Sequence, residues 1–200
     1  MAEQLSLLDP PKQKNAKPRV IYFDIETLRS AQDVGGWGNI QKMGVASLVC
    51  YDSVDEAFSE YGESRVLDFV QKLQTADLVI GYNILRFDYT VLKGYTSFNF
   101  ASLPSLDLMD DLTKVLGHRL KLDSLAQATL GQGKTADGLQ SLQWVKEGRF
   151  DLIREYCQKD VEVTRDLHLY GAREGHVYYQ NYAEKVKVPI QWSLDKFIKK

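Results

Sequence analysis

The sequence predicts an α/β domain in which helices flank a mixed β-sheet. Apolar, β-rich runs are concentrated in the first half of the chain, where they alternate with helical patterns. The second half has mostly helical periodicity and ends in two short β-rich segments. The 200 residues suffice for one domain with a sizeable core. No internal repeat or second domain is recognisable, so we expect a flexible tail at 1–18 and one domain at 19–200.

The expected elements of the first half follow in chain order. RVIYFDIET predicts a buried strand from Val20 to about Ile25, and the turn-rich SAQDVGGWGN follows it. A second strand begins at Met43, in MGVASLVCYD. The remaining patterns predict a strand at 57–61, a helix in RVLDFVQKLQTA, a strand in DLVIGYN ending at Gly81, a helix from Arg86 to Lys93 and a strand in SLDLMDDL.

The second half predicts three helices and a hairpin. LKLDSLAQATLG is expected to form a helix that ends at Gly131, a favourable residue after a helix. Asp137 is a candidate N-cap for a helix in GLQSLQWVKEG, which closes at Gly148. A long helix runs from about Phe150 to Arg173. HVYYQ and KVKVPIQW then predict a short β-hairpin.

Composition narrows the classes of protein. Hydrophobic residues make up 44% and charged residues 26%, which is typical of a soluble globular domain. No apolar run approaches the ~20 residues that cross a bilayer, and the N-terminus lacks the pattern of a secretory signal. Cys50 and Cys157 suggest neither a metal site nor a disulfide framework, so a cytoplasmic location is expected. The net charge of −2 would become +2 without four metal-binding acids, so it does not exclude a nucleic acid.

Two acidic residues mark the end of the first strand. Asp24 and Glu26 are two residues apart, so both side chains project from one face. Burying the two carboxylates together is unfavourable without a cation, and oxygen ligands suit Mg²⁺ or Mn²⁺. On its own, the pair fits a solvated strand end better than a metal site.

Two further segments carry candidate ligands. In GYNILRFDYTVL, Asp88 lies near the start of a helix, where the helix dipole alone would favour an acid. In YCQKD, Tyr156 and Asp160 share one helix face. Val163 and Leu167 continue that face, so it points inward, and an inward aspartate needs a partner or a metal. A core tyrosine beside an ion-paired aspartate is the competing interpretation.

FDIET, GYNILRFD and YCQKD, in this order, resemble the three exonuclease motifs of the DEDD superfamily in its tyrosine subclass. The combination is similar to the proofreading domain of family B DNA polymerases and to free-standing bacterial relatives. It covers about residues 19–170. The resemblance implies a ribonuclease H-like fold and a metal-dependent 3′→5′ exonuclease that acts on DNA in repair or replication.

The resemblance also implies residue roles. Two divalent cations, Mg²⁺ or Mn²⁺, would be held by four carboxylates, and Tyr156 would orient the attacking water. The histidine subclass has His where Tyr156 stands, and none of the three histidines of this chain occupies that position. The metal ligands would be Asp24, Glu26, Asp88 and Asp160.

Substrate contacts are expected beside these motifs. The candidates are Thr27, Leu28, Trp37, Asn83 and Phe87. An aromatic side chain can stack on any base, and this contact is worth ~1–3 kcal/mol. Core packing explains Phe87 equally well, and Trp37 could fold back onto the domain from the tip of its glycine-rich loop.

Nucleotide hydrolysis, RNA degradation and binding without catalysis are the alternative functions. ATLGQGKT, at 128–135, fits a relaxed phosphate-loop pattern, with Ala128 in place of the first glycine. That motif requires a preceding strand, whereas the residues before it have helical spacing. An exoribonuclease is the alternative within the same class, because a contact to the 2′-hydroxyl distinguishes RNA from DNA and the sequence does not identify such a contact. A module that only binds nucleic-acid ends is the non-catalytic alternative.

The tail carries a possible partner motif. QLSLL, at residues 4–8, is similar to the peptide QL[SD]LF by which bacterial replication and repair proteins bind the sliding clamp, with Leu8 in place of Phe. Exposed leucines with no core to bury them suggest a partner, and the chain up to Pro18 would be a flexible tether. The alternatives are a disordered tail or docking on the domain. The clamp contacts would be Gln4, Leu5, Leu7 and Leu8.

Overall fold

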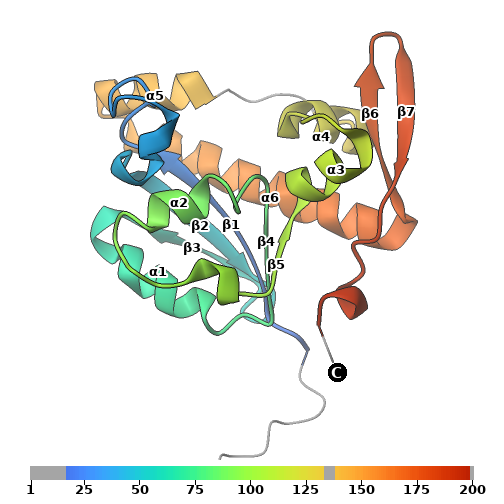
Figure 1. The fold of residues 1–200 in the computed structure, drawn as a ribbon, viewed down its shortest axis with the longest axis horizontal. Helices are drawn as coiled ribbons and strands as arrows, with labels where there is room; N and C mark the ends of the chain where they lie inside the picture. Colours follow the sequence, from blue (N-terminus) through green and yellow to red (C-terminus); the bar gives the residue numbers. More distant parts are fainter. Residues whose placement is uncertain (1–16, 133–137, 199–200) are drawn as a thin grey trace, which may run out of the picture.

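The computed structural model describes residues 17–132 and 138–198, and its centre is a five-stranded mixed sheet (Figure 1). The strand order is β3-β2-β1-β4-β5. β1 pairs antiparallel with β2 and parallel with β4, β2 pairs antiparallel with β3, and β5 extends the parallel side. The strands are β1 (Val20–Thr27), β2 (Val45–Asp52), β3 (Ala57–Tyr61), β4 (Leu78–Gly81) and β5 (Ser105–Asp107).

Helices cover both faces of this sheet, as the sequence predicts (Figure 1). One face packs against α1 and α2, and the other packs against the long helix α6. The α-helices are α1 (Val66–Leu73), α2 (Asp88–Leu92), α3 (Leu108–Leu116), α4 (Leu122–Leu130), α5 (Gly138–Glu147) and α6 (Phe150–Glu174). Short 3₁₀ turns are η1 (Trp37–Lys42), η2 (Glu63–Arg65), η3 (Phe100–Ser102) and η4 (Leu194–Lys196).

Strand periodicity decides which side chains of β1 meet α6. Ile21, Phe23 and Ile25 belong to the core beneath α1 and α2. Tyr22 belongs to the core beneath α6. Because side chains alternate along a strand, Asp24 and Glu26 continue the face of Tyr22 and point toward α6.

Helix α6 is anchored to the sheet by a buried histidine near its C-terminal end. The His168 Nδ1 lies 2.8 Å from the Tyr22 hydroxyl, and its Nε2 lies 2.9 Å from the Trp192 carbonyl oxygen. Burial lowers the pKa of His168 to about 4. Gly171, one turn further along, lies against the Trp192 ring, and a Cβ there would overlap it. This packing connects the end of the chain to the main sheet.

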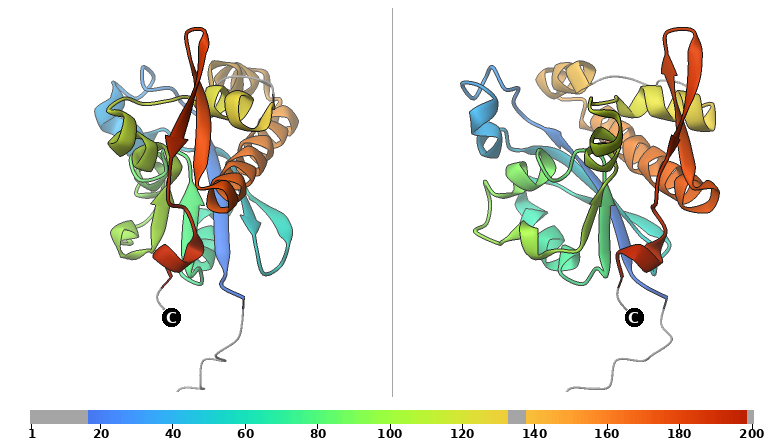
Figure 2. Two further views of the ribbon diagram at one scale, coloured as in Figure 1. Left: turned by 90° about the vertical axis from the view of Figure 1, so that its right-hand side faces the viewer. Right: turned by 45° about the vertical axis from the view of Figure 1, so that its right-hand side comes forward.

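The predicted C-terminal hairpin is confirmed. β6 (His176–Asn181) and β7 (Glu184–Pro189) pair antiparallel. Val177 and Val188 are buried in the core beneath α6, so the base of the hairpin is fixed. The hairpin projects from the domain beside α4 (Figure 2).

Most predicted elements are confirmed, and the differences are local. The second strand begins at Val45, and α2 is shorter than the predicted helix from Arg86 to Lys93. The prediction of a strand throughout SLDLMDDL was wrong after Asp107. The Asp107 carboxylate accepts hydrogen bonds from the Met109 and Asp110 N–H groups, which starts α3 instead. The candidate N-cap Asp137 lies outside the described residues.

Three other sequence expectations can be checked. The residues that precede the glycines of ATLGQGKT form helix α4, so the strand that a phosphate loop requires is not there. Cys50 and Cys157 are buried free thiols. In the part of the chain that the structure describes, no helix combines the length and apolarity needed to cross a membrane.

Candidate active site

The C-terminal end of β1 brings two carboxylates beneath α6. Asp24 and Glu26 are half-buried, while their neighbours Phe23, Ile25 and Thr27 are buried. The pairing of β1 with β2 is irregular between Glu26 and Thr27. This irregularity follows both acids, so the regular alternation of β1 still places them on the face of Tyr22. Both acids therefore face the space between the sheet and α6.

Helix α6 supplies the third carboxylate. The Cys157 thiol donates to the Asp24 carbonyl oxygen at 3.3 Å, which holds this part of α6 against β1. Asp160 lies one turn further along on the same helix. Asp24, Glu26 and Asp160 each offer an oxygen atom, and these three atoms lie within 4.8 Å of one another. The structure thus brings together acids that are 134 or more residues apart in sequence.

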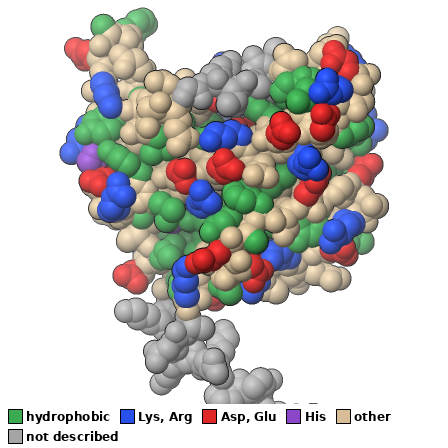
Figure 3. Space-filling model, turned by 180° about the vertical axis from the view of Figure 1, so that it is seen from behind, with side chains coloured by type: hydrophobic (Ala, Val, Ile, Leu, Met, Phe, Trp, Pro, Cys, Tyr) green, Lys and Arg blue, Asp and Glu red, His purple; other side chains and the backbone are tan. Residues whose placement is uncertain are grey.

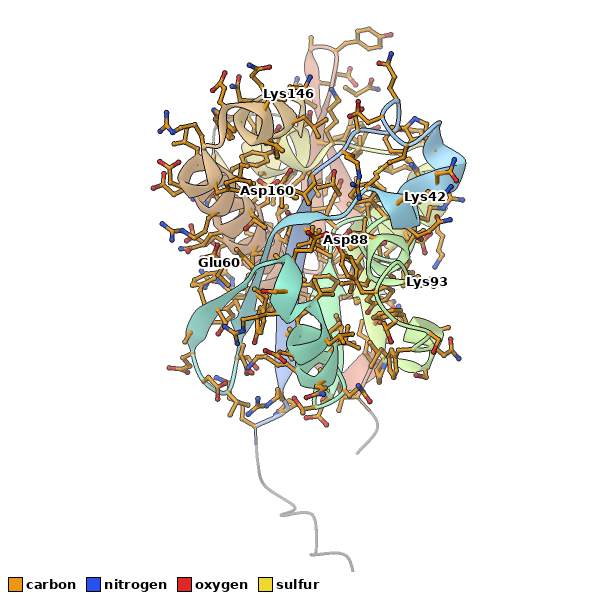
Figure 4. All side chains as sticks on the ribbon, turned by 90° about the vertical axis from the view of Figure 1, so that its left-hand side faces the viewer. Lys42, Glu60, Asp88, Lys93, Lys146 and Asp160 are labelled. Carbon is orange, nitrogen blue, oxygen red and sulfur yellow. The ribbon has the colours of Figure 1, made fainter. Side chains whose placement is uncertain are left out.

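Asp88 approaches from the other face of the sheet. It begins helix α2, and Figure 4 shows it and Asp160 directed toward the same central region. Asp88 is 2% exposed, and its Oδ1 atom is buried without a hydrogen-bond partner among the residues that are described. Asp88 lies outside the group of three within 4.8 Å, but the Asp24 charge contributes to its raised pKa.

The four carboxyls resist ionisation together. Burial is the main cause that raises the pKa of Asp24 to about 6. Burial and then the Asp24 charge raise the pKa of Asp160 to about 8, and the Tyr156 hydroxyl opposes this rise. The same two causes raise the pKa values of Glu26 and Asp88 well above the usual range. Within residues 17–132 and 138–198, no cation forms an ion pair with any of the four.

This arrangement fits divalent cations. Uncompensated buried carboxylates are unfavourable unless they are protonated or coordinate a metal. The donors are all oxygen atoms, which hard ions such as Mg²⁺ and Mn²⁺ prefer. The partnerless oxygen of Asp88 adds an available donor beside the group of three.

Tyr156 stands beside the acids. It lies one turn before Asp160 on α6. Its pKa is raised by burial and then by the charges of Asp160 and Glu26, so its hydroxyl keeps its proton. Trp144 of α5 packs edge-on against the Tyr156 ring, with centroids 6.2 Å apart. The ring is therefore held in place next to the carboxylates.

The turn before Asp88 is fixed by a carboxylate that the sequence did not single out. Asp107, at the end of β5, is 4% exposed. Its carboxylate accepts the N–H groups of Asn83 at 2.8 Å and Leu85 at 3.0 Å, in addition to the two at the start of α3. Asn83 has a left-handed backbone, with φ of 69°. Asp107 thus fixes the conformation of the turn that positions Asp88.

A close approach also shapes this turn. Gly81 ends β4, and a Cβ there would overlap the Ile84 side chain and lie 3.1 Å from the Phe23 carbonyl oxygen. Glycine is therefore required for the chain to fold tightly over β1. Backbone geometry therefore accounts for the Gly81 and Asn83 of the GYN sequence, independently of any contact with a substrate.

A cavity of about 690 Å³ opens over Asp24, Glu26 and Asp88, and neither Asp160 nor Tyr156 is among its lining residues. Of the predicted substrate contacts, Thr27, Trp37, Asn83 and Phe87 line it, whereas Leu28 is not among the lining residues. Trp37 is 70% exposed, so it does not fold back onto the core. Other lining residues are not among the residues predicted from the sequence, and they include Arg29, Ser30, Gln32, Tyr82, Lys121 and Leu142.

Lys121 is the most informative of the missed residues. It precedes helix α4, is exposed and lines the cavity beside the acids. The Tyr82 hydroxyl donates to the Leu120 carbonyl oxygen at 2.9 Å, which holds the Lys121 backbone near the end of β4. In the sequence, Lys121 stands about 30 residues from any motif, so no local pattern identified it.

The outer face of α6 has a different character. Acidic and basic side chains are interspersed on the back of the molecule (Figure 3). Many of them pair with each other along this helix, as Arg149 does with Asp151, Lys159 with Glu162, Arg165 with Asp166 and Arg173 with Glu174. This face is a solvated surface of mixed charge, whereas Asp88 and Asp160 lie in the interior of the view in Figure 4.

Sequence and structure comparisons define the class. Residues 21–170 match the family described as the RNase_H superfamily, and the chain belongs to it. This is a superfamily of nuclease-type hydrolases, and the predicted ribonuclease H-like fold is confirmed. No curated protein matches the chain.

One similar solved structure is a family B DNA polymerase from the hyperthermophilic archaeon Pyrobaculum calidifontis. The TM-score is 0.55 and the sequence identity is 18%, over 82% of this chain and 25% of the polymerase chain. The chain therefore spans about a quarter of that polymerase, and at this identity the likeness concerns the fold.

Proposed function

We propose that this chain is a 3′→5′ exonuclease that hydrolyses phosphodiester bonds at the 3′ end of DNA. The observation that carries the proposal is the convergence of Asp24, Glu26, Asp88 and Asp160 at one end of β1, with Tyr156 beside them. The RNase H superfamily supports nuclease chemistry. The order of the three motifs supports the tyrosine subclass of DEDD exonucleases.

The acids and the tyrosine would have different roles in the reaction. The four carboxylates would hold two divalent ions, Mg²⁺ or Mn²⁺, which activate water and stabilise the leaving oxygen when bound. Tyr156 keeps its hydroxyl proton and so can orient a water molecule by hydrogen bonding. Its ring is fixed by Trp144, which limits the directions its hydroxyl can take.

The cavity would receive the terminal nucleotide. Trp37 and Phe87 supply aromatic surfaces for a base, and stacking tolerates any base. Arg29 and Lys121 supply positive charge for phosphate. A cavity of about 690 Å³ accommodates a nucleotide, so a single-stranded or frayed end is the expected substrate.

A degradation assay tests this function. Single-stranded DNA, duplex DNA and RNA, each labelled at the 5′ end, would be incubated with the purified protein and Mn²⁺. We expect a ladder that shortens by single nucleotides, fastest on single-stranded DNA, and no shortening in EDTA. Shortening of RNA alone would assign an exoribonuclease. Binding of ends without shortening would assign the non-catalytic module and overturn the proposal.

We propose separately that QLSLL in the tail binds a bacterial sliding clamp. Gln4, Leu5, Leu7 and Leu8 lie outside the described residues, so the proposal rests on the sequence pattern alone. Attachment would raise the local concentration of the nuclease at primer ends. A labelled peptide of residues 1–12 should bind a clamp, and Gln4→Ala and Leu7→Ala should each weaken it. Binding that is indifferent to both substitutions would overturn this proposal.

A further inference from the structure

The β6–β7 hairpin presents one polar and basic face. Cross-strand pairing places Tyr178 opposite Lys187 and Gln180 opposite Lys185. Because side chains alternate along strands, His176 shares this face. Val177, Tyr179 and Val188 point the other way, into the core. None of the residues named on the basic face is acidic, in contrast to the paired charges on the outside of α6.

A groove of about 550 Å³ lies between the hairpin and helix α4. Its wall on the hairpin side consists of Gln180 and Lys185 from the basic face. The wall on the α4 side carries a hydroxyl, an amide and, at the end nearer the acid cluster, the Asp123 carboxylate, so the positive charge of the groove comes from the hairpin. The residues on that side are Asp123, Ser124, Gln127 and Ala128.

The two walls are held together rigidly. The Thr129 hydroxyl of α4 donates to the Tyr178 carbonyl oxygen at 2.8 Å and accepts from the Tyr178 N–H at 2.9 Å. This double hydrogen bond fixes the edge of β6 on the helix. The groove is thus formed in the folded chain itself and does not depend on a mobile loop.

The groove begins beside the acid cluster. The start of α4 separates the two hollows, because Lys121 lines the active-site cavity while Asp123 and Ser124 line the groove. The Asp123 charge also contributes to the raised pKa values of Asp160 and Tyr156, which places it near them. A strand that leaves the acid cluster past the start of α4 would enter the groove.

We propose that this groove and the basic hairpin face bind the sugar-phosphate backbone of a single nucleic-acid strand whose 3′ end lies at the acid cluster. The inference rests on the proposed exonuclease function and extends it to a second binding site. Lysine ammonium groups suit phosphates, and the serine and glutamine side chains suit the sugar-phosphate backbone. Tyr182, at the hairpin tip, is 98% exposed and can stack on a base.

The ring of Tyr178 helps to direct Lys185. The Lys185 Nζ lies 4.5 Å from the centroid of this ring, so the ammonium is held over the basic face. The groove therefore carries a cation in a defined place and aromatic surface beside it. Basic groups interleaved with aromatic rings are typical of single-strand binding that tolerates any sequence.

Substrate length provides the test. The double variant Lys185→Ala/Lys187→Ala would be compared with wild type on a 20-nucleotide strand and on a dinucleotide. We expect KM for the 20-nucleotide strand to rise roughly tenfold with kcat unchanged, because two phosphate contacts are lost. The loss should be confined to the long strand. Lys196→Ala is the matched control, since Lys196 is an exposed lysine on η4, at the opposite end of the molecule from the hairpin tip (Figure 1).

A binding measurement separates this inference from the proposed function. Anisotropy of a labelled 20-nucleotide single strand would be measured against salt concentration for Asp24→Asn, with and without the two lysine substitutions. The slope of log K against log salt should become shallower by roughly 0.7 per lost contact. Unchanged KM and slope would overturn the inference, and so would equal losses on the dinucleotide and the long strand. If wild type degrades neither substrate, the proposed function fails while the salt slope still decides the groove.

Discussion

Buried carboxylates at the two ends of β1 have opposite surroundings. At the N-terminal end, Asp52 of β2 pairs in register with Ile21 and lies 2.8 Å from both Arg19 and Lys72. Burial would raise the pKa of Asp52, but the Lys72 ammonium and the Val54 N–H outweigh it and lower the pKa. At the C-terminal end, no cation of the described residues forms an ion pair with the four acids, which face one another, and their pKa values rise.

This difference separates a structural acid from a functional one. Asp52 is satisfied within the chain and needs no ligand. Asp107 is a second case of satisfaction, because backbone N–H groups surround its carboxylate. The four acids around Asp24 pair with no cation among the described residues, so their charges remain unfavourable unless they are protonated or coordinate a metal. Burial alone therefore does not identify a functional acid, whereas burial without partners does.

The largest expected effect comes from Asp24→Asn. Activity should fall by several orders of magnitude, because Asp24 lies among the other acids and influences all of them. The metal-free protein should be at least as stable as wild type, because one of several repelling charges is removed. The loss of activity would be measured as kcat/KM, and the stability of the metal-free protein by thermal melting. Near-normal activity, or activity lost only through unfolding, would remove Asp24 from the site.

Tyr156→Phe should have the next largest effect. The loss of one positioned hydroxyl typically costs ~10²–10⁴-fold in rate, which is less than the loss of a metal ligand. The packing of the ring against Trp144 remains, so the fold should be unaffected. Single-turnover rates at saturating Mn²⁺ would measure the effect. If the variant were as inactive as Asp24→Asn, an orienting role would be wrong.

Asp52→Asn tests the other end of the strand. Removal of this charge leaves Arg19 and Lys72 without their shared partner, and we expect a loss of roughly 1–3 kcal/mol in the free energy of unfolding. Activity per folded molecule should be unchanged, because the site is at the opposite end of β1. Urea denaturation and kcat would be compared. A fall in kcat without loss of stability would contradict the comparison.

The pH dependence of stability should also differ between the two ends. The folded pKa of Asp160, about 8, exceeds the unfolded value, so the folded protein binds more protons. Stability is therefore lost as pH rises from 7 to 8.5, by about 1 kcal/mol for Asp160, because its proton dissociates within this range. His168 does not interfere, since its folded pKa is about 4 and it is largely neutral in both states above pH 7. Asp52, whose folded pKa is lowered, is ionised in both states there and adds no slope.

Denaturation curves at pH 7 and 8.5 without metal would measure this loss. Asp160→Asn should reduce the slope, and Mn²⁺ or Mg²⁺ should raise the melting temperature most at the higher pH, where the carboxylates have lost their protons. Stability that is constant over this range would show that the acids ionise normally.

The smallest expected effect concerns Trp37, at the rim of the cavity. Trp37→Ala should weaken binding of a single-stranded end by about 1 kcal/mol, the lower end of the range for stacking on a base. The melting temperature should not change, because the side chain is 70% exposed. Anisotropy with labelled ends would measure it. Lost stability with unchanged binding would assign Trp37 to the fold.

Local patterns in the sequence determined most of the elements and the motif residues. An apolar, β-rich run identified β1, and the alternation of strand side chains identified the face shared by Asp24 and Glu26. Helical spacing identified the face of α6 shared by Tyr156 and Asp160. These predictions succeed because two and 3.6 residues per repeat are properties of the backbone itself. The prediction of the fifth strand was wrong beyond Asp107, where α3 begins. The Asp107 carboxylate caps this helix by accepting hydrogen bonds from N–H groups of its first turn, which have no partner within the helix.

Only the tertiary structure decided which of the acids share a space and which are satisfied. Apart from the motif resemblance, nothing in the sequence distinguishes Asp88 from Asp52 or Asp107, because the partners of Asp52 and Asp107 come from other strands and turns. Nor does the sequence show any sign of Lys121 or of the groove beside the hairpin, since both depend on how α4 packs. Burial and the distance between charges determine whether a carboxylate keeps its proton, pairs with a cation or can coordinate a metal. Those quantities arise from contacts between segments far apart in the chain, so the folded structure alone sets them.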